Sequence, residues 1–173
     1  GAYVILANRP VRDFPLATHT FLMVQPTGEN RELYGERAKF HNRIILSGDQ
    51  DWVDELKRNG LVKRDRDFMN YENTQLIYLQ PPSGMTMVEF EAAVIDAWDS
   101  YVDGSAKYDN IATPPGKNSN SLTSGVLDAA GLKATKPSGW ALRGWNPGWG
   151  KPVKIDPPPK SGVAPVSWTT MLL

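Results

Sequence analysis

The order of strand-like and helix-like segments constrains the fold of this chain more than any other feature of its sequence. Short runs of β-branched and aromatic residues, separated by turn residues, occupy much of the chain as far as Leu79. Two segments with capping residues and apolar residues at helical spacing follow them. Short strands covered by amphipathic helices form an α+β domain. We therefore expect an α+β fold in which a small antiparallel sheet packs against helices.

Four segments have the composition of strands, namely residues 3–7, 18–25, 43–46 and 74–79. The second is the clearest, because its β-branched and aromatic residues end at a turn-forming cluster, Pro-Thr-Gly-Glu-Asn. The residues after this cluster, 32–39, alternate with a period of two. They are therefore predicted to return as the second strand of a hairpin.

Two helices are predicted from their capping residues. Thr86 and Glu89 have the spacing of a capping box, and apolar residues follow at helical intervals as far as Tyr101. Asn118 can cap a second helix, which would end at Gly131. The buried face of this second helix is expected to consist of Leu122, Val126 and Ala130.

A third helix is expected between the last two predicted strands. Residues 47–49 offer capping side chains, and Gly60 is a plausible stop. Between them, Trp52, Val53 and Leu56 form a one-sided apolar stripe. This spacing predicts a helix in the stretch.

The composition changes at residue 134. Half of the fourteen prolines and four of the six tryptophans lie between this point and the last residue. Such a segment has little regular structure, yet it is too aromatic for a disordered tail. We expect residues 1–133 to form the core of a single domain and residues 134–173 to pack on it as an irregular wrap. The expected anchors are Trp140, Trp145, Trp149 and Trp168.

Charge and cysteine content exclude several classes of function. Nineteen basic residues balance nineteen acidic ones, so there is no electrostatic footprint for nucleic acid or an anionic membrane. No apolar run approaches the roughly 20 residues of a membrane span, and a soluble protein is expected. The chain has no cysteine, which excludes disulfides, thiolate metal sites and a cysteine nucleophile. With only two histidines, neither a metal nor another cofactor is expected.

The feature that most clearly indicates a chemical function is the sequence Asn-Ser-Asn-Ser at 118–121, at the start of the second predicted helix. Outward-pointing N–H groups and the helix dipole stabilise a developing oxyanion at this place. A serine hydroxyl needs a neighbouring base to act as a nucleophile. Ser119 is therefore the candidate nucleophile, and the strand residue His19 is its candidate base. Asn118 and Asn120 are candidates to orient the substrate or to donate to its carbonyl oxygen.

A purely structural role for these residues is the alternative. Serine and asparagine before an amphipathic helix are ordinary capping residues. A strand histidine such as His19 is commonly half-buried with its hydrogen bonds satisfied. The tryptophans of the wrap are packing anchors in this interpretation, although Trp140, Trp145 and Trp149 are close enough in sequence to share a sugar-binding surface. Sequence alone leaves both interpretations open.

The order of these pieces resembles the circularly permuted papain-like superfamily of bacterial cell-wall amidases and related thiol hydrolases. The pieces are the strand Ala-Thr-His-Thr-Phe-Leu at 17–22 and the helix opening Gly-Lys-Asn-Ser-Asn-Ser at 116–121. In that superfamily the histidine strand precedes a nucleophile helix that opens with Asn-Cys-Asn or Asn-Cys-Thr. The chain is also similar to bacterial proteins, some attached to polymorphic toxins, that carry Asn-Ser-Asn-Ser or Asn-Ser-Asn-Thr and a later Pro-Gly-Trp, here at 147–149. The similarity extends over roughly residues 15–150 in element order, but over only about ten residues in motif.

The resemblance implies that His19 stands at the histidine of the family and Ser119 at its cysteine. Serine thus replaces the thiol that defines the chemistry of the family, and a serine is the weaker nucleophile at neutral pH. The residue that orients the histidine has no clear counterpart. Glu36, on the expected partner strand of the hairpin, is the candidate for that role.

Two functions follow from the sequence. The first is hydrolysis of an amide or ester bond in a peptide or small molecule through an acyl-enzyme on Ser119, and the resemblance implies bacterial cell-wall peptide or a toxin target as substrate. The second is a non-catalytic binding or structural module that keeps a papain-like fold and has lost the cysteine. The resemblance further implies a bacterial toxin or effector in which other domains of a larger secreted protein accompany this chain.

Overall fold

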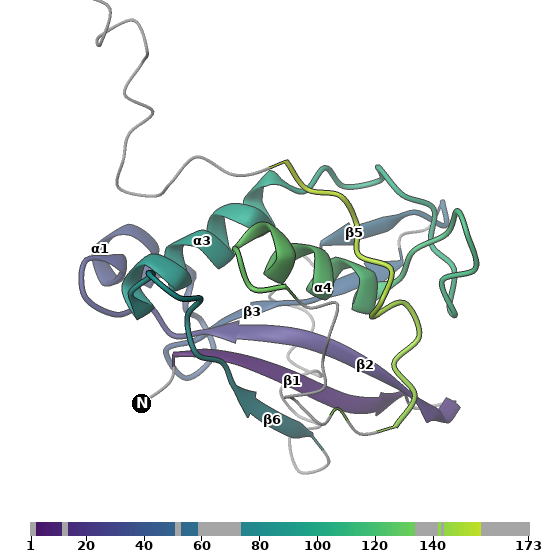
Figure 1. The fold of residues 1–173 in the computed structure, drawn as a ribbon, viewed down its shortest axis with the longest axis horizontal. Coiled ribbons are helices and arrows are strands. Elements are labelled where there is room, and N and C mark those ends of the chain that lie inside the picture. Colours follow the sequence, from purple (N-terminus) through teal and green to yellow (C-terminus); the bar gives the residue numbers. More distant parts are fainter. Residues whose placement is uncertain are drawn as a thin grey trace, which may run out of the picture.

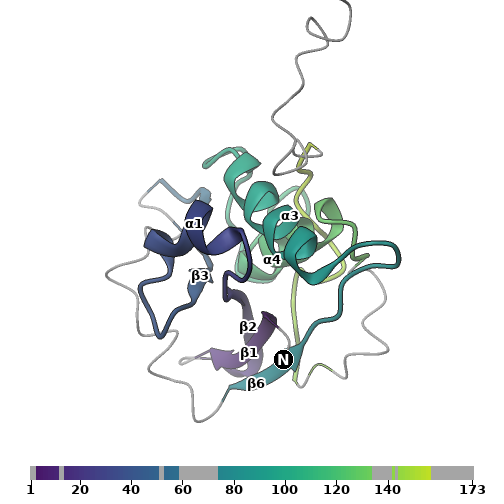
Figure 2. The ribbon, with the colours of Figure 1, turned by 90° about the vertical axis from the view of Figure 1, so that its left-hand side faces the viewer.

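The computed structural model describes residues 3–11, 14–50, 53–58, 74–133, 142 and 144–156. Its main sheet lies on one side of the molecule, and the helices α3 and α4 cover one face of that sheet (Figures 1 and 2). This is the α+β architecture with a small antiparallel sheet that the sequence predicts.

The elements follow one another in a strand-rich first half and a helical second half. They are β1 (Val4–Val11), β2 (Phe14–Val24), α1 (Asn30–Tyr34), η1 (Gly35–Arg37), β3 (Ile44–Leu46), β4 (Gly48–Gln50), β5 (Leu56–Arg58), β6 (Gln75–Tyr78), α3 (Met87–Ser100) and α4 (Ser119–Ala129). Among the described residues, none of the helices combines the length and the apolar character needed to cross a bilayer.

The main sheet has four strands in the order β3-β2-β1-β6, and neighbouring strands are antiparallel. β1 and β2 form a long hairpin in which Val4 pairs with Val24 and Arg9 pairs with His19. β3 pairs only with the last residues of β2, starting at Leu22. In the described part of the chain, the edge of β2 before Leu22 therefore has no strand partner on that side. The start of α4 docks on this free edge.

Side chains alternate across the sheet, and both of its faces are apolar. Val4, Leu6 and Leu22 belong to the main core beneath the helices, whereas Ile5 and Phe21 belong to a second cluster. The helices complete the main core with Phe90, Val94, Ile95, Leu122, Val126 and Leu127. Because the core lies between α4 and β2, it fixes the start of α4 against the sheet.

Local hydrogen bonds define the starts of the two long helices, as the sequence predicts. The Thr86 hydroxyl accepts from the Glu89 N–H at 3.1 Å, and the Glu89 carboxylate accepts from the Thr86 N–H at 3.1 Å. A second capping box opens α4 at Asn118. At the other end of α4, Gly131 has a φ of +94°, a left-handed conformation that glycine adopts without steric cost.

The predicted hairpin strand at residues 32–39 is wrong. These residues lie in α1, in η1 and in the turn after them, and β2 pairs with β1 and β3 instead. Leu33 is 57% exposed, whereas Tyr34 and Ala38, four positions apart, pack against the core. The apolar contacts thus follow helical spacing, although the residue types at 32–39 alternate as they do in a strand.

The predicted helix at 47–60 is also wrong, because β4 and β5 form a two-stranded antiparallel hairpin there. Only part of the expected apolar stripe is buried: Leu56 is fully covered, but Val53 is 46% exposed. Asp54 has a φ of +60°, which a right-handed helix does not contain. Trp52 and Gly60 lie outside the described residues.

The segment 144–156 runs along α4 and is the described part of the expected wrap. Trp149 is buried in the main core, whereas Trp145 is 49% exposed; Trp140 and Trp168 lie outside the described residues. The Val153 N–H donates to the Ser121 carbonyl at 2.9 Å. A Cβ on Gly125 would lie 2.5 Å from the Val153 carbonyl oxygen. Only glycine at 125 lets the segment lie this close to the helix.

Candidate active site

The structure brings His19 and Ser119 together, although 100 positions separate them in the chain. His19 lies on β2, and Ser119 is the first residue of α4, which lies beside that strand (Figure 1). The Nδ1 atom of His19 is 2.6 Å from the Oγ atom of Ser119. This distance is a short hydrogen bond, and it lies within the reach that a general base requires.

Ser47 holds the other side of the imidazole. The Oγ atom of Ser47 is 2.9 Å from Nε2 of His19, and Ser47 is buried directly after β3. If Nδ1 accepts the Ser119 proton, Nε2 carries the ring proton and donates it to Ser47, so this pair of contacts suits one tautomer. The ring also stacks on Phe21, with 5.8 Å between the centroids. His19 is therefore fixed from two sides and from one face.

The position of Ser47 corrects the assignment of Glu36 as the residue that orients the histidine. Glu36 lies in η1 rather than on a strand paired with β2, and its side chain is exposed. η1 follows α1, which lies at the end of the molecule away from the start of α4 (Figure 1). No pattern of residues pointed to Ser47, because nothing in the sequence shows that β3 ends beside His19.

Asn120 docks α4 on the free edge of β2. Its Oδ1 atom accepts from the N–H and the hydroxyl of Thr20, both at 2.7 Å. Its Nδ2 group donates to the Thr18 carbonyl at 2.8 Å and to the Pro147 carbonyl at 3.0 Å. The amide thus pairs with the strand edge as a neighbouring strand would, and both of its protons are engaged.

Asn118 is the N-cap of α4. Its Oδ1 atom accepts from the Ser121 N–H at 3.1 Å, and the Ser121 hydroxyl accepts from the Asn118 N–H at 3.2 Å. Its Nδ2 group donates to the carbonyls of Pro147 at 2.7 Å and Asn110 at 3.1 Å. With both amide protons engaged, neither Asn118 nor Asn120 is free to donate to a substrate. The substrate-binding role expected for the two asparagines is therefore wrong, and their role is to position the helix.

The Pro147-Gly148-Trp149 element closes this arrangement. The Pro147 carbonyl accepts from both asparagine side chains, and Gly148 has a φ of +87°. A Cβ on Gly148 would collide with Oδ1 of Asn118 and would lie 2.7 Å from Oγ of Ser121. On the sheet side, the Thr18 N–H donates to the Trp145 carbonyl at 2.8 Å. The segment therefore ties the first turn of α4 to β2.

Tyr108 is a further residue of the site. Burial raises the pKa of its phenol above the ordinary value, and the Asp49 carboxylate raises it further, whereas hydrogen bonds with the hydroxyl and the backbone N–H of Ser119 lower it. With its pKa raised, the phenol keeps its proton at neutral pH. A neutral O–H group and a helix N–H thus stand together beside the Ser119 hydroxyl. The sequence placed Tyr108 before the helix but gave it no role.

The described residues contain no group of three or more histidine, aspartate or glutamate side chains arranged to hold a metal ion. The groups that the structure brings together at the site are a hydroxyl, an imidazole, a phenol and backbone N–H groups. Together these groups can transfer a proton from the serine and stabilise a negative oxygen.

No protein-family model, curated protein or solved structure matches this chain. The resemblance to permuted papain-like hydrolases therefore stays an expectation from the motifs. Function has to follow from the chemistry of the site.

Proposed function

We propose that this chain is a serine-dependent hydrolase of amide or ester bonds that acts through an acyl-enzyme on Ser119. The observation that carries the proposal is the 2.6 Å contact between Oγ of Ser119 and Nδ1 of His19. A serine beside an oriented imidazole is the arrangement that converts a weak nucleophile into a reactive one. The histidine strand precedes the nucleophile helix, which agrees with the permuted papain-like order.

In the first half of the reaction, Oγ of Ser119 forms a bond to the substrate carbonyl carbon while its proton passes to Nδ1 of His19. The carbonyl π electrons move to oxygen, which becomes an oxyanion. When this oxyanion collapses, the bond to the leaving amine or alcohol breaks, and His19 gives the leaving group its proton. In the second half, His19 takes a proton from water, whose oxygen forms a bond to the acyl carbon; when the second oxyanion collapses, the bond to Oγ breaks and His19 returns the proton to Ser119. Protons and electron pairs balance with water as the only reactant besides the substrate.

The oxyanion is held by the first turn of α4 and by Tyr108. A helix N-terminus presents N–H groups without an intrahelical partner and a positive dipole. The Tyr108 phenol lies close enough to Ser119 for the hydroxyl and the backbone N–H of that residue to lower its pKa. A phenol whose pKa lies at or above its ordinary value is protonated at neutral pH, so the Tyr108 O–H group and the N–H groups of this helix turn can face a developing negative oxygen.

The substrate class follows from the resemblance. We propose an acyl compound of the peptide type, with bacterial cell-wall peptide or the target of a toxin or effector as the implied source. Other domains of a larger secreted protein would then deliver the chain to that substrate.

The second candidate is a non-catalytic binding or structural module. The observation that favours it is burial, because Ser119 is only 6% exposed and His19 only 9%. In such a module, Ser119, His19 and Ser47 form a buried polar chain that fastens α4 to the sheet. The two candidates differ in whether an electrophile can reach Oγ of Ser119.

Labelling with a fluorophosphonate decides between them. The hydrolase proposal predicts one covalent adduct per folded chain, and peptide mass spectrometry should locate it on Ser119. Labelling should disappear in urea, because the reactivity depends on the folded contact with His19. Absence of an adduct after prolonged incubation with several small fluorophosphonates would support the binding module. An adduct on another serine would also contradict the proposed nucleophile.

Replacing Tyr108 by phenylalanine tests the oxyanion site. The change removes one donor and leaves the ring that fills the space, so we expect kcat to fall by about 10²–10³-fold with little change in KM. The matched control is Tyr101→Phe, which removes a hydroxyl that donates to the Leu56 carbonyl and should leave kcat unchanged. Steady-state hydrolysis of an activated ester measures both variants. Equal rates for Tyr108→Phe and the native chain would remove Tyr108 from the mechanism.

A further inference from the structure

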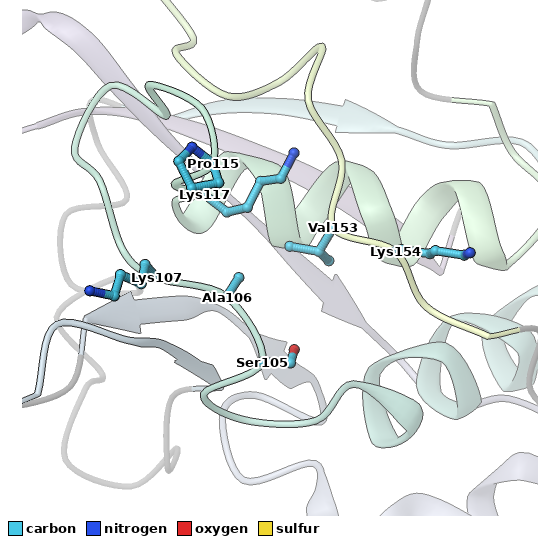
Figure 3. Close-up of a pocket in the computed structure, with 7 residues that line it drawn as sticks. All are labelled: Ser105, Ala106, Lys107, Pro115, Lys117, Val153 and Lys154. Atoms are coloured by element: carbon cyan, nitrogen blue, oxygen red, sulfur yellow. The ribbon is translucent and has the colours of Figure 1, made fainter.

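Two further features lie near the start of α4. The first is a pocket of about 500 Å³ between the segment that leads into α4 and the segment that runs back along it (Figure 3). The ammonium groups of Lys107 and Lys154 point apart there, so the pocket does not gather these charges around a ligand. The second is the Ser47-Gly48 link, through which β3 passes into β4. This link contacts both members of the catalytic pair.

The first residue of the link contacts the imidazole. Oγ of Ser47 lies 2.9 Å from Nε2 of His19. On the other side of the ring, Nδ1 lies 2.6 Å from Oγ of Ser119. Ser47, His19 and Ser119 are 1%, 9% and 6% exposed. The imidazole is therefore enclosed between two buried hydroxyl groups, and the positions of these hydroxyls determine the lengths of its two hydrogen bonds.

The second residue of the link contacts the backbone of the nucleophile. A Cβ on Gly48 would lie 3.1 Å from Cα of Ser119 and 3.1 Å from Cδ2 of Leu122. Both distances are shorter than the roughly 3.5–4.0 Å at which two carbon atoms pack best. The φ of Gly48 lies outside the left-handed region, so an alanine there would add a methyl group without backbone strain. Glycine at 48 thus allows β4 to lie directly against Ser119.

These contacts form a closed ring. Ser47 contacts His19, His19 contacts Ser119, and Ser119 contacts Gly48, which a peptide bond joins to Ser47. Both sides of the ring are held from outside, because Asn120 fastens α4 to β2 and because β4 pairs with β5. A methyl group on Gly48 would therefore push α4 and the link apart. At least one of the two hydrogen bonds of the imidazole would then lengthen.

We propose that the Ser47-Gly48 link is the positioning element of the catalytic pair. Ser47 holds the imidazole in the tautomer that accepts the Ser119 proton, and Gly48 lets Oγ of Ser119 approach that imidazole. Neither residue touches the substrate, and each acts through its neighbour in the pair. The inference rests on the proposed function, because a rate depends on this positioning only if Ser119 is the nucleophile.

Gly48→Ala tests the link through the reaction rate. A misplacement of about 1 Å can slow a reaction by about 10²-fold, so a shift of a few tenths of an ångström should lower kcat by about 10-fold with KM almost unchanged. Gly35→Ala is the matched control, because a Cβ there meets nothing within 4 Å and the φ of Gly35 is −58°. Steady-state hydrolysis of an activated ester measures both variants, and urea unfolding verifies that both are folded.

The ¹⁵N NMR spectrum of the imidazole rings reports the same positions without turnover. The chain has two histidines, and the exposed His41 serves as the internal reference. In the native chain we expect His19 to have a protonated Nε2 and an Nδ1 that accepts a hydrogen bond. Gly48→Ala should move at least one of these two nitrogen signals, and Ser47→Ala should produce a mixture of tautomers. Gly35→Ala should leave both signals in place.

Ser47→Ala also covers the case in which Gly48→Ala does not fold, because it removes one atom and adds none. It should lower kcat as well, since part of the imidazole would then carry its proton on Nδ1. The proposal is overturned if the His19 signals stay native in the variants that fold, or if they move while kcat stays native. A native chain that neither hydrolyses the ester nor reacts with a fluorophosphonate contradicts the proposed function instead. In that event the spectra alone decide whether the link positions the two residues.

Discussion

Replacement of Ser119 by alanine, or of His19 by asparagine, is expected to lower hydrolysis by about 10³–10⁶-fold. Each change removes one partner of the 2.6 Å contact through which the serine loses its proton. Alanine leaves no nucleophile, and asparagine has no basic nitrogen. Residues that act as one unit are strongly non-additive, so the double variant should be no slower than the slower single variant. Steady-state hydrolysis of an activated ester and the rate of fluorophosphonate labelling measure the effect.

The chain offers matched controls for both replacements. Ser124 is a buried serine of the same helix whose hydroxyl donates to the Ser121 carbonyl at 3.2 Å, and His41 is the second histidine, exposed in a turn. Ser124→Ala and His41→Asn should keep the native rate. If Ser119→Ala hydrolyses the ester as fast as the native chain, the hydrolase proposal fails and the binding module is favoured.

Asn120→Ala is expected to have the largest effect on stability, with a loss of about 3–5 kcal/mol in the free energy of unfolding. The change removes one buried amide and leaves three buried groups without this partner, namely the N–H and the hydroxyl of Thr20 and the carbonyl of Thr18. The Pro147 carbonyl loses one of its two bonds and keeps the one from Asn118. Each unsatisfied buried group costs about 1–3 kcal/mol, and water that enters the space recovers part of this cost.

Equilibrium unfolding in urea measures the loss of stability. Thr123→Val is the control with which this loss is compared. Thr123 donates a single hydrogen bond to the Thr20 carbonyl at 3.0 Å, and valine conserves its shape, so about 1 kcal/mol is expected from this control. Because Asn120 also sets the position of Ser119 over β2, labelling of the folded fraction should slow in Asn120→Ala but not in Thr123→Val. A loss for Asn120→Ala no larger than that for the control would show that the amide does not fasten the helix.

The parts of the fold that depend on local interactions were predictable. The capping boxes at Thr86 and at Asn118 join residues only three positions apart, so the two partners can be recognised from their spacing in the sequence. The four expected strands and the α+β class are confirmed. They were predictable for the same reason, since β-branched residues and turn clusters act locally. Their exact ends were not predictable: β1 extends to Val11 and β2 begins at Phe14, because strand pairing, not propensity, sets those ends.

Short segments with weak patterns were predicted incorrectly. The stretch after β2 alternates like a strand but folds as α1 and η1, because Glu91 of α3 accepts hydrogen bonds from Thr27 and Asn30 and holds this stretch beside the helix. The stretch after β3 has helical spacing but forms the β4–β5 hairpin. Hydrogen bonds to a distant segment support it, because the Leu56 N–H donates to the Ala106 carbonyl and the Asp54 carbonyl accepts from the Tyr108 N–H. A segment of only a few residues can fit both the period of a strand and the period of a helix. Its contacts with distant parts of the chain therefore decide which of the two forms.

The sequence by itself determined the two capped helices, the four strands of the main sheet and the identity of the two residues that meet. A nucleophile at a helix start needs a base, and His19 was the natural candidate. Only the tertiary structure decided how that pair is held. Ser47 reaches the imidazole because β3 ends beside it, and the two asparagines bind backbone carbonyls instead of a substrate because a free strand edge and the Pro147 carbonyl lie within reach. These contacts join residues that lie 27 to 102 positions apart in the chain. They depend on strand register and on close packing, which no local pattern of residues contains.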